Sequence, residues 1–318
     1  MRKTITIIKQ DQKDVADIFK NGIKTEMLFR ELQRDTIGKS GSNPTWGYVY
    51  SKNNGKLKYE GVALHKEYDY DFPFAAYAEK VWSILGKELL EKGIRVPNID
   101  IVEPSPGYEE IISYRLMDNG KEDMIHLKDT LFNKFEREEI KAKRDIYTLD
   151  ELLECIKLQI QDEQNYANIE KDIINVLLLD AVTNNGDRHA FNWGLVRDKD
   201  TNEYSLAVFD HSSAFVNMFE DREFFVRNGW NTTYITVGND RGRNKIGSSG
   251  ETVVRYISTQ YPEYFKEFAD KLDKKLPEII EIIKNEKMKI DFNRLSKKLG
   301  EKRQFLIKLR DREELEHE

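Results

Sequence analysis

The chain of 318 residues is 39% hydrophobic and 11% aromatic, which is enough to form a core in one large domain or two smaller ones. Its formal net charge of -6 argues against direct binding to nucleic acids or to anionic membranes. No apolar run approaches the ~20 residues of a membrane span, and the single cysteine, Cys155, excludes an intramolecular disulfide and a cysteine-based zinc site.

The N-terminal segment bears on the location of the protein. The apolar stretch before Lys9 is too short for the core of a signal peptide. We therefore expect a cytoplasmic protein, and a secreted effector is left open as the alternative.

The first 118 residues predict a β-rich region with one helix. Asn53-Asn54-Gly55 lies between two β-like runs, a pattern typical of a hairpin turn. Asp71 and Pro73 then mark the start of a helix that is predicted to end near Gly93. Strands are expected at residues 4–9, 47–51, 56–66, 94–103 and 109–116.

After Gly120 the pattern changes to mostly helix. Thr148 and Glu151 have the spacing of a capping box at the start of a helix over residues 149–160. Further helices are expected at residues 169–181, 251–272, 276–287 and 294–309. The chain is therefore predicted to be an α+β protein with a β-rich region, residues 1–118, and a mainly helical region, residues 119–318.

A polar stretch, NNGDRHAFNWGLV at residues 184–196, directly follows the apolar helix. Short strands expected on either side of a turn would bring Asn192 and Asp210 to the same end of a hairpin. An amide oxygen and a carboxylate are hard ligands suited to Mg²⁺. Asp187, on the same loop, is placed to orient a hydroxyl nucleophile and accept its proton. Such an arrangement serves phosphoryl transfer.

The spacing Asp187-x4-Asn192, followed by a hairpin and Asp210, resembles the catalytic loop and metal-binding aspartate of the protein-kinase-like fold. The usual kinase loop reads H-R-D-x4-N, whereas this chain has D-R-H with the same Asp-to-Asn spacing. D-R-H-x-x-N is similar to the HipA-like bacterial serine/threonine kinases, including the short CtkA-type members, and to the phosphoinositide kinases. The order of segments in the β-rich region favours the HipA-like branch, and the resemblance covers most of residues 37–216.

The resemblance implies a two-lobed kinase-like fold, with a β-rich N-lobe and a mainly helical C-lobe, that uses ATP and Mg²⁺. Asp187 would position and deprotonate the acceptor hydroxyl, while Asn192 and Asp210 would hold Mg²⁺ against the ATP phosphates. His189 would orient the loop, and Arg188 would either contact a phosphate or pair with an acid.

A glycine- and serine-rich segment, GKSGSNPTWG at residues 38–47, is a candidate phosphate-binding loop, because its glycines let backbone N–H groups approach phosphates. By the resemblance, two of its serines are also possible autophosphorylation sites. The nucleotide-binding residues expected here are Gly38, Ser40, Gly41 and Ser42.

Lys66, which ends the segment GVALHK, resembles the phosphate-binding lysine of a kinase strand, and Glu79 on the following helix would be its partner. Lys58 is the competitor. Both lysines lie on one face if the strand is unbroken, so direction alone does not separate them. Lys66 is favoured because it lies closer to the helix of Glu79.

These features predict ATP- and Mg²⁺-dependent phosphoryl transfer to serine or threonine of a protein substrate, with autophosphorylation. The alternatives are a phosphoinositide or small-molecule kinase on the same fold, and a non-catalytic nucleotide-binding partner in a toxin–antitoxin pair. Expected partners are the protein substrate and a possible antitoxin-like protein, without direct nucleic acid binding. Because His65, His126 and His317 lack partners at ligand spacing, we expect no catalytic zinc site.

Overall fold

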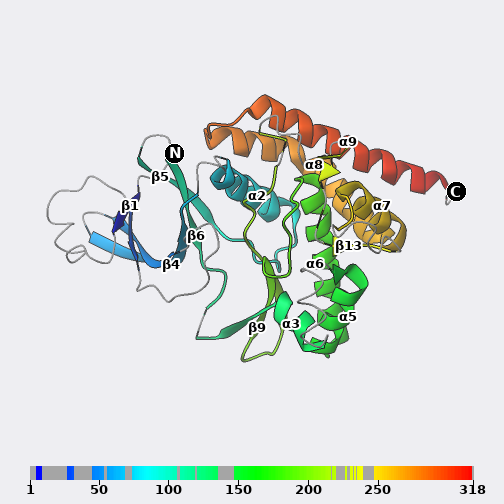
Figure 1. Cartoon of the computed structure of the whole chain (residues 1–318), viewed down its shortest axis with the longest axis horizontal. Helices are drawn as coiled ribbons and strands as arrows, with labels where there is room; N and C mark the ends of the chain where they lie inside the picture. Colours follow the sequence, from blue (N-terminus) through cyan, green and yellow to red (C-terminus); the bar gives the residue numbers. More distant parts are fainter. Residues whose placement is uncertain are drawn as a thin grey trace. The chain divides into compact units, whose positions relative to one another are not determined.

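The computed structural model has a mixed α/β fold, in which a β-sheet region is followed along the chain by a mainly helical part (Figure 1). The chain divides into two compact units. Unit 1 comprises Met1–Ser83 and Pro97–Leu116, and unit 2 comprises Ile84–Val96 and Met117–Glu318. The structure describes residues 5–8, 27–31, 45–53, 56–68, 74–105, 108–118, 120–134, 147–215, 217–219, 226–227, 230–231, 233, 235–238 and 247–316.

Unit 1 contains a six-stranded sheet in the order β1-β2-β3-β4-β6-β5. The strands are β1 (Ile5–Ile8), β2 (Met27–Glu31), β3 (Thr45–Asn53), β4 (Lys56–Lys66), β5 (Ile99–Ser105) and β6 (Tyr108–Tyr114). Strands β1 and β2 are parallel, and all other neighbours are antiparallel. The predicted hairpin is confirmed, because Asn53 pairs with Lys56. Strand β2 was not predicted, and β5 begins at Ile99 rather than at residue 94, after Pro97, which has no N–H to donate.

A β-bulge in β4 decides which side chains share a face of this sheet. The pairing with β3 shifts by one residue between Val49 and Tyr50, so Glu60 is left as the extra residue of β4. The extra residue inverts the alternation of side chains between Lys58 and Lys66, which therefore lie on opposite faces. The expectation that both lysines share a face holds only for an unbroken strand and is wrong here.

The two faces of the sheet carry separate apolar clusters. On one face, called the Val49 face, the buried cluster consists of Val49, Ala63, Val102 and Ile112. On the other, called the α2 face, Ile99 and Ile111 pack against Ala76 of helix α2 (Ala75–Leu89). The helix predicted after Pro73 is thereby confirmed as α2, and it covers one face only of the sheet.

Unit 2 contains a three-stranded antiparallel sheet in the order β10-β9-β7 and a series of helices. Its elements are β7 (Glu122–His126), α3 (Leu127–Lys134), β8 (Tyr147–Thr148), α5 (Leu149–Gln159), α6 (Glu163–Val182), β9 (Trp193–Asp198), β10 (Tyr204–Val208), β11 (Val226–Arg227), β12 (Trp230–Asn231), β13 (Ile235–Thr236), α7 (Gly250–Gln260), α8 (Pro262–Asn285) and α9 (Phe292–Glu316). The β9–β10 hairpin and the capping box of Thr148 and Glu151 are confirmed. Strand β7 was not predicted, because its short sequence EDMIH is extended only through its pairing with β9.

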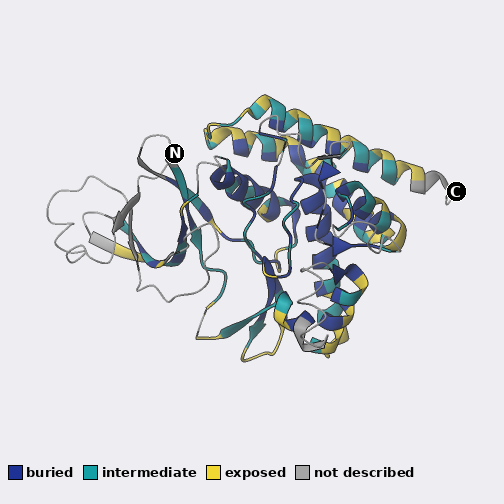
Figure 2. Cartoon of the chain, in the orientation of Figure 1, coloured by how far each residue is buried: buried dark blue, intermediate teal, exposed yellow. Residues whose placement is uncertain are grey.

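Helix α6 lies in the core of unit 2, and every residue from Asp172 to Val182 is buried (Figure 2). The predicted helix at residues 169–181 corresponds to this apolar half. The observed helix begins earlier, where Asp162 caps it by accepting a hydrogen bond from the Asn165 N–H at 2.7 Å. No helix in the described part of the chain, α6 included, is long and apolar enough to cross a membrane.

The observed C-terminal helices differ from the predicted ones at two prolines, Pro262 and Pro277. The long helix predicted after residue 250 is interrupted at Tyr261, whose φ of -135° and ψ of 55° are not helical, and Pro262 then begins α8. Pro277 lies inside α8, although a break was expected near it. Its neighbours Leu276 and Ile279 are buried, so their packing outweighs the backbone hydrogen bond that proline cannot make.

Asp172 is an acidic residue within the buried half of α6, with an exposure of 7%. Burial, reinforced by the negative charge of Glu91, raises the pKa of its carboxyl from 3.8 to about 7. Because the folded-state pKa lies above the unfolded-state value, the native protein loses stability as the pH rises from about 4 to about 7. The loss amounts to at most about 4 kcal/mol.

We expect Asp172→Asn to raise the free energy of unfolding by up to about 4 kcal/mol at pH 8, and by about 1–2 kcal/mol at pH 5. The variant removes the ionisation and keeps the shape of the side chain. Urea unfolding at both pH values measures the difference, with the exposed Asp200→Asn as the control. An equal gain at the two pH values would contradict a neutral Asp172 carboxyl in the native core.

Candidate active site

The predicted catalytic residues lie on the loop that follows α6. The Thr183 hydroxyl donates a hydrogen bond to the Leu179 carbonyl at 2.9 Å and closes the helix. Asn184 then adopts a φ of 51°, and the Asn185 N–H donates to the Asp180 carbonyl at 2.8 Å. Asparagine tolerates this left-handed backbone better than most residues do, so the chain turns sharply here.

Arg188 holds the loop together from inside the protein. Its side chain is 1% exposed and forms an ion pair with Asp180, with Nε–Oδ2 and Nη2–Oδ1 distances of 2.8 and 3.0 Å. Its Nη1 donates to the main-chain carbonyls of Asn192 and Phe209, both at 2.9 Å, and Nη2 lies 2.8 Å from His211 Nδ1. Of the two roles left open for Arg188, the structure shows pairing with an acid.

The β9–β10 hairpin brings Asn192 and Asp210 to one end, as the sequence predicts. Trp193 pairs with Val208, and the Phe209 N–H donates to the Asn192 carbonyl at 3.0 Å. Asp210 follows directly and has a φ of 57°. A non-glycine residue with positive φ is uncommon, and such strained positions gather at functional sites.

Asp187 is surrounded by polar groups from the loop and from the segment after β10. Its main-chain carbonyl accepts a hydrogen bond from Asn192 Nδ2 at 2.7 Å. Its Oδ2 accepts one from Ser213 Oγ at 3.5 Å, and its Oδ1 lies 4.0 Å from His189 Nε2. Burial raises the pKa of the Asp187 carboxyl, and the charge of Asp210 adds to this, while His189 opposes it. Asp187 therefore holds a proton more readily than an ordinary aspartate does.

These side chains fit a divalent cation by the chemistry of their donor atoms. Asn192 commits its amide nitrogen to the main chain, so its oxygen is the atom suited to bind a metal. The Asp210 carboxylate is oriented by Ser212 Oγ, which donates to Oδ1 at 3.0 Å. The mutual repulsion of Asp187 and Asp210 is the kind of interaction that a cation offsets. Oxygen donors of this type are those that Mg²⁺ prefers.

In unit 1, Lys66 and Glu79 form a buried ion pair, with Nζ 2.8 Å from Oε1. The Tyr68 hydroxyl also donates to Glu79 Oε1, at 3.1 Å. Lys58 is exposed and pairs instead with Glu60 on its own strand, at 3.2 Å. The structure thus distinguishes the two candidate lysines, because Lys66 forms an ion pair with Glu79 of α2 and Lys58 does not.

Of the remaining predicted site residues, the structure describes His189 but not those of the glycine- and serine-rich loop. His189 is partly exposed, and its ring lies edge-on to that of Phe191 with centroids 6.0 Å apart. Gly38, Ser40, Gly41 and Ser42 lie outside the described residues, so the phosphate-binding loop stays a prediction.

Several residues that contact the site were not identified from the sequence, among them His211, Ser212, Asp180 and Ser213. Asp180, the partner of Arg188, could have been found as an acid within an apolar helix, where burial demands a partner. Ser213, which donates to Asp187, lies 26 positions away in the sequence and has no recognisable spacing signal.

Comparison with solved structures places the chain among proteins of a kinase-like fold. It is similar to the proinflammatory kinase CtkA of Helicobacter pylori, with a TM-score of 0.61 and 15% identity over 90% of this chain and 96% of CtkA. It is also similar to HipA of Shewanella oneidensis MR-1, from a toxin–antitoxin complex of HipA, HipB and operator DNA. That match has a TM-score of 0.51 and 12% identity over 89% of this chain and 67% of the other. No protein-family model and no curated protein sequence matches the chain.

The chain therefore has the fold of the HipA-like kinases, as the resemblance in the sequence implied. At identities this low, the likeness establishes the fold, and the activity has to be argued from the site.

Proposed function

We propose that the chain is a kinase that transfers the γ-phosphoryl group of ATP to a serine or threonine hydroxyl of a protein, itself included. Residues 1–118 would serve as its N-lobe and residues 119–318 as its C-lobe. The observation that carries the proposal is the gathering of Asp187, Asn192 and Asp210 where α6 and the β9–β10 hairpin end. A fold shared with the kinase CtkA supports it.

Asp187 acts on the acceptor hydroxyl. The hydroxyl proton passes to the Asp187 carboxylate as the oxygen bonds to the γ-phosphorus, and the bond to the bridging oxygen breaks to release ADP. A carboxyl with a raised pKa suits this role, because it binds the proton more readily near neutral pH. Ser213 and His189 hold the carboxylate in orientation.

Asn192 and Asp210 would hold Mg²⁺, which supplies charge neutralisation at the phosphate oxygens when bound. Arg188 keeps their loop in place through its bonds to the Asn192 and Phe209 carbonyls, rather than by contacting a phosphate. Lys66, oriented by Glu79, would bind an ATP phosphate.

Other acceptors and partners define the alternatives. A phosphoinositide kinase is disfavoured by the net charge of -6, which opposes binding to anionic membranes. A regulator that binds nucleotide without catalysis is disfavoured by the presence of Asp187 together with both metal-site residues. Because the similar HipA is part of a complex with HipB, we propose an antitoxin-like protein as a partner. The cytoplasmic location expected from the short N-terminal apolar stretch is part of the proposal.

Incubation of the purified chain with Mg²⁺ and labelled ATP, with and without a cell lysate, tests the proposal. Mass spectrometry then identifies which residues gain phosphate. Label on serine or threonine of a protein is the expected result. Label confined to lipids or small molecules would favour the alternative acceptors, and its absence with retained nucleotide binding would favour the non-catalytic role.

We expect Lys66→Ala to weaken ATP binding by at least about 10-fold, the range for loss of a charged hydrogen bond, and Lys58→Ala to change it little. Lys58 is a matched control, because it lies on the same strand but is exposed and faces the other way. Titration with ATP and Mg²⁺ measures both variants. The reverse order would transfer the phosphate-binding role to Lys58.

A further inference from the structure

Three potential metal ligands lie together in unit 1, and two of them are the chain neighbours of Lys66, although none belongs to the proposed kinase site. His65 is on β4, Glu67 follows the end of that strand, and Glu110 is on β6. The antiparallel register pairs Lys66 with Ile111, so one step further it places Glu67 opposite Glu110. The sequence analysis found no partner for His65 at ligand spacing, because residues of neighbouring strands have no fixed spacing along the chain; the pairing of β4 with β6 supplies Glu110.

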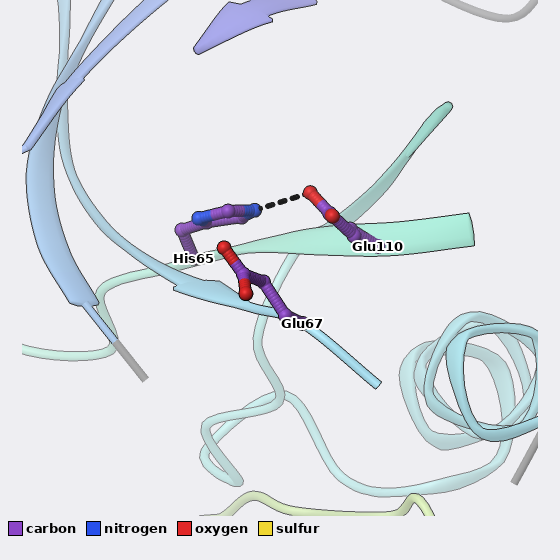
Figure 3. Close-up of side chains that lie close together, drawn as sticks. All are labelled: His65, Glu67 and Glu110. Atoms are coloured by element: carbon purple, nitrogen blue, oxygen red, sulfur yellow. Dashed lines mark hydrogen bonds and ion pairs between the residues drawn. The ribbon is translucent and has the colours of Figure 1, made fainter. Parts of the chain in front are cut away.

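The side chains point toward one another (Figure 3). His65 Nε2 lies 2.7 Å from Glu110 Oε2, and one ligand atom from each of the three residues lies within 4.8 Å of the others. His65 is only 1% exposed, whereas Glu67 is exposed to solvent. A buried nitrogen ligand is thus fixed at the base of the cluster, and the cluster opens to solvent on the side of Glu67.

The charges of the cluster favour a cation. Two glutamates directly opposite each other on antiparallel strands repel and destabilise the pairing. The hydrogen bond between His65 Nε2 and Glu110 Oε2 engages one of these carboxylates, and the carboxylate of Glu67 lies beside it. A divalent cation would offset the charge of both carboxylates and would take His65 Nε2 as its nitrogen ligand.

We propose that His65, Glu67 and Glu110 bind a divalent transition-metal cation of the zinc type. One imidazole and two carboxylates suit zinc, whereas Mg²⁺ and Ca²⁺ prefer oxygen ligands alone. Three protein ligands leave a coordination position for water or another ligand.

The cluster is on the Val49 face of the sheet. His65 alternates with Lys66 along β4, and Lys66 points to the α2 face, where it meets Glu79. A metal ion would therefore tie β4 to β6 beside Lys66 without occupying the face on which Lys66 is held. Zinc binding here does not depend on the proposed kinase activity, and either can fail without the other.

Isothermal titration of the tag-free chain with zinc chloride, at saturating Mg²⁺ and without ATP, tests the site. We expect saturable binding of one zinc ion per chain. Because loss of a second-shell partner alone costs about 10–100-fold in affinity, loss of the ligand in Glu67→Gln should cost at least about 10-fold. Glu278→Gln, an exposed glutamate on α8, is the matched control and should bind as the wild type does.

Co²⁺ gives an independent readout, because its visible absorption reports the ligands around it. The wild type and Glu278→Gln should show the same band, and Glu67→Gln and Glu110→Gln should lose it. Glu67 is exposed, so its substitution preserves the fold even if a change at buried His65 does not. Equal zinc affinity in Glu67→Gln and wild type, or no saturable binding by the wild type, would overturn the site.

Discussion

Asp187→Asn is expected to lower the rate of phosphoryl transfer by about 10²–10⁴-fold, the contribution typical of a general base, while ATP affinity stays within a few-fold of wild type. Asparagine keeps the shape of the side chain but is a far poorer proton acceptor. An interaction needed mainly in the transition state affects the rate and hardly affects binding in the ground state.

Asp210→Ala provides the contrast that separates the two acidic roles. Asp210 is proposed to hold the metal ion, so its loss should abolish Mg²⁺-dependent ATP binding as well as activity. Melting temperature, ATP affinity and autophosphorylation measured on one preparation of each variant distinguish these outcomes. A stable Asp187→Asn protein that transfers phosphate at the wild-type rate would remove Asp187 from the mechanism.

The pH dependence of the rate gives Asp187 a second signature. Its folded-state pKa is raised, chiefly by burial, so the carboxylate becomes protonated at a higher pH than an ordinary aspartate would. As the proposed base, Asp187 would act in its deprotonated form, so the rate should fall on the acidic side at a pH above 3.8. This acidic limb should be missing from the residual activity of Asp187→Asn.

The sequence predicted those parts of the fold and site in which local pattern and tertiary structure agree. The apolar run of α6 has to be buried whatever surrounds it, and a polar loop at its end has to reach a surface. The hairpin between Trp193 and Val208 is closed by a turn-rich stretch, so its register follows from local chemistry. The sequence alone therefore predicted that Asn192 and Asp210 lie at the same end of the hairpin.

Other features depend on partners that no local pattern specifies. The segment EDMIH is extended because β9 supplies its hydrogen bonds, and Pro277 is helical because its neighbours are buried. The bulge at Glu60 moves Lys58 to the other face of the sheet without any signal in the alternation of the strand. His65 and Glu110 lie side by side because β4 pairs with β6, a contact between residues far apart in the sequence. In each case, a non-local contact decides the local structure.

Asp180→Ala is expected to lower the free energy of unfolding by about 3–5 kcal/mol, the cost of removing one partner of a buried ion pair. Asp180 and Arg188 are each 1% exposed, so the guanidinium would be left in the core without its carboxylate. Asn185 Nδ2, which donates to Asp180 Oδ1 at 2.8 Å, would lose its partner as well. The expected loss is a large part of the about 5–15 kcal/mol that stabilises a typical domain.

Glu251→Ala is the matched control for this effect, because Glu251 also pairs with an arginine, Arg255, at 2.9 Å, but on an exposed helix surface. Such a pair contributes about 0.2–1 kcal/mol, so this variant should unfold almost as the wild type does. Urea unfolding at neutral pH compares the two. If Asp180→Ala does not fold, Asp180→Asn retains the shape and allows a smaller loss to be measured.

The Asp180–Arg188 pair would also link stability to the proposed phosphoryl transfer. Arg188 bonds the carbonyls of Asn192 and Phe209, so a guanidinium freed from Asp180 no longer fixes the two strand ends that carry the proposed metal ligands. Phosphoryl transfer should therefore fall in Asp180→Asn even at temperatures where circular dichroism shows the chain fully folded. If this variant keeps wild-type stability and rate, the buried pair neither holds the core nor positions the loop.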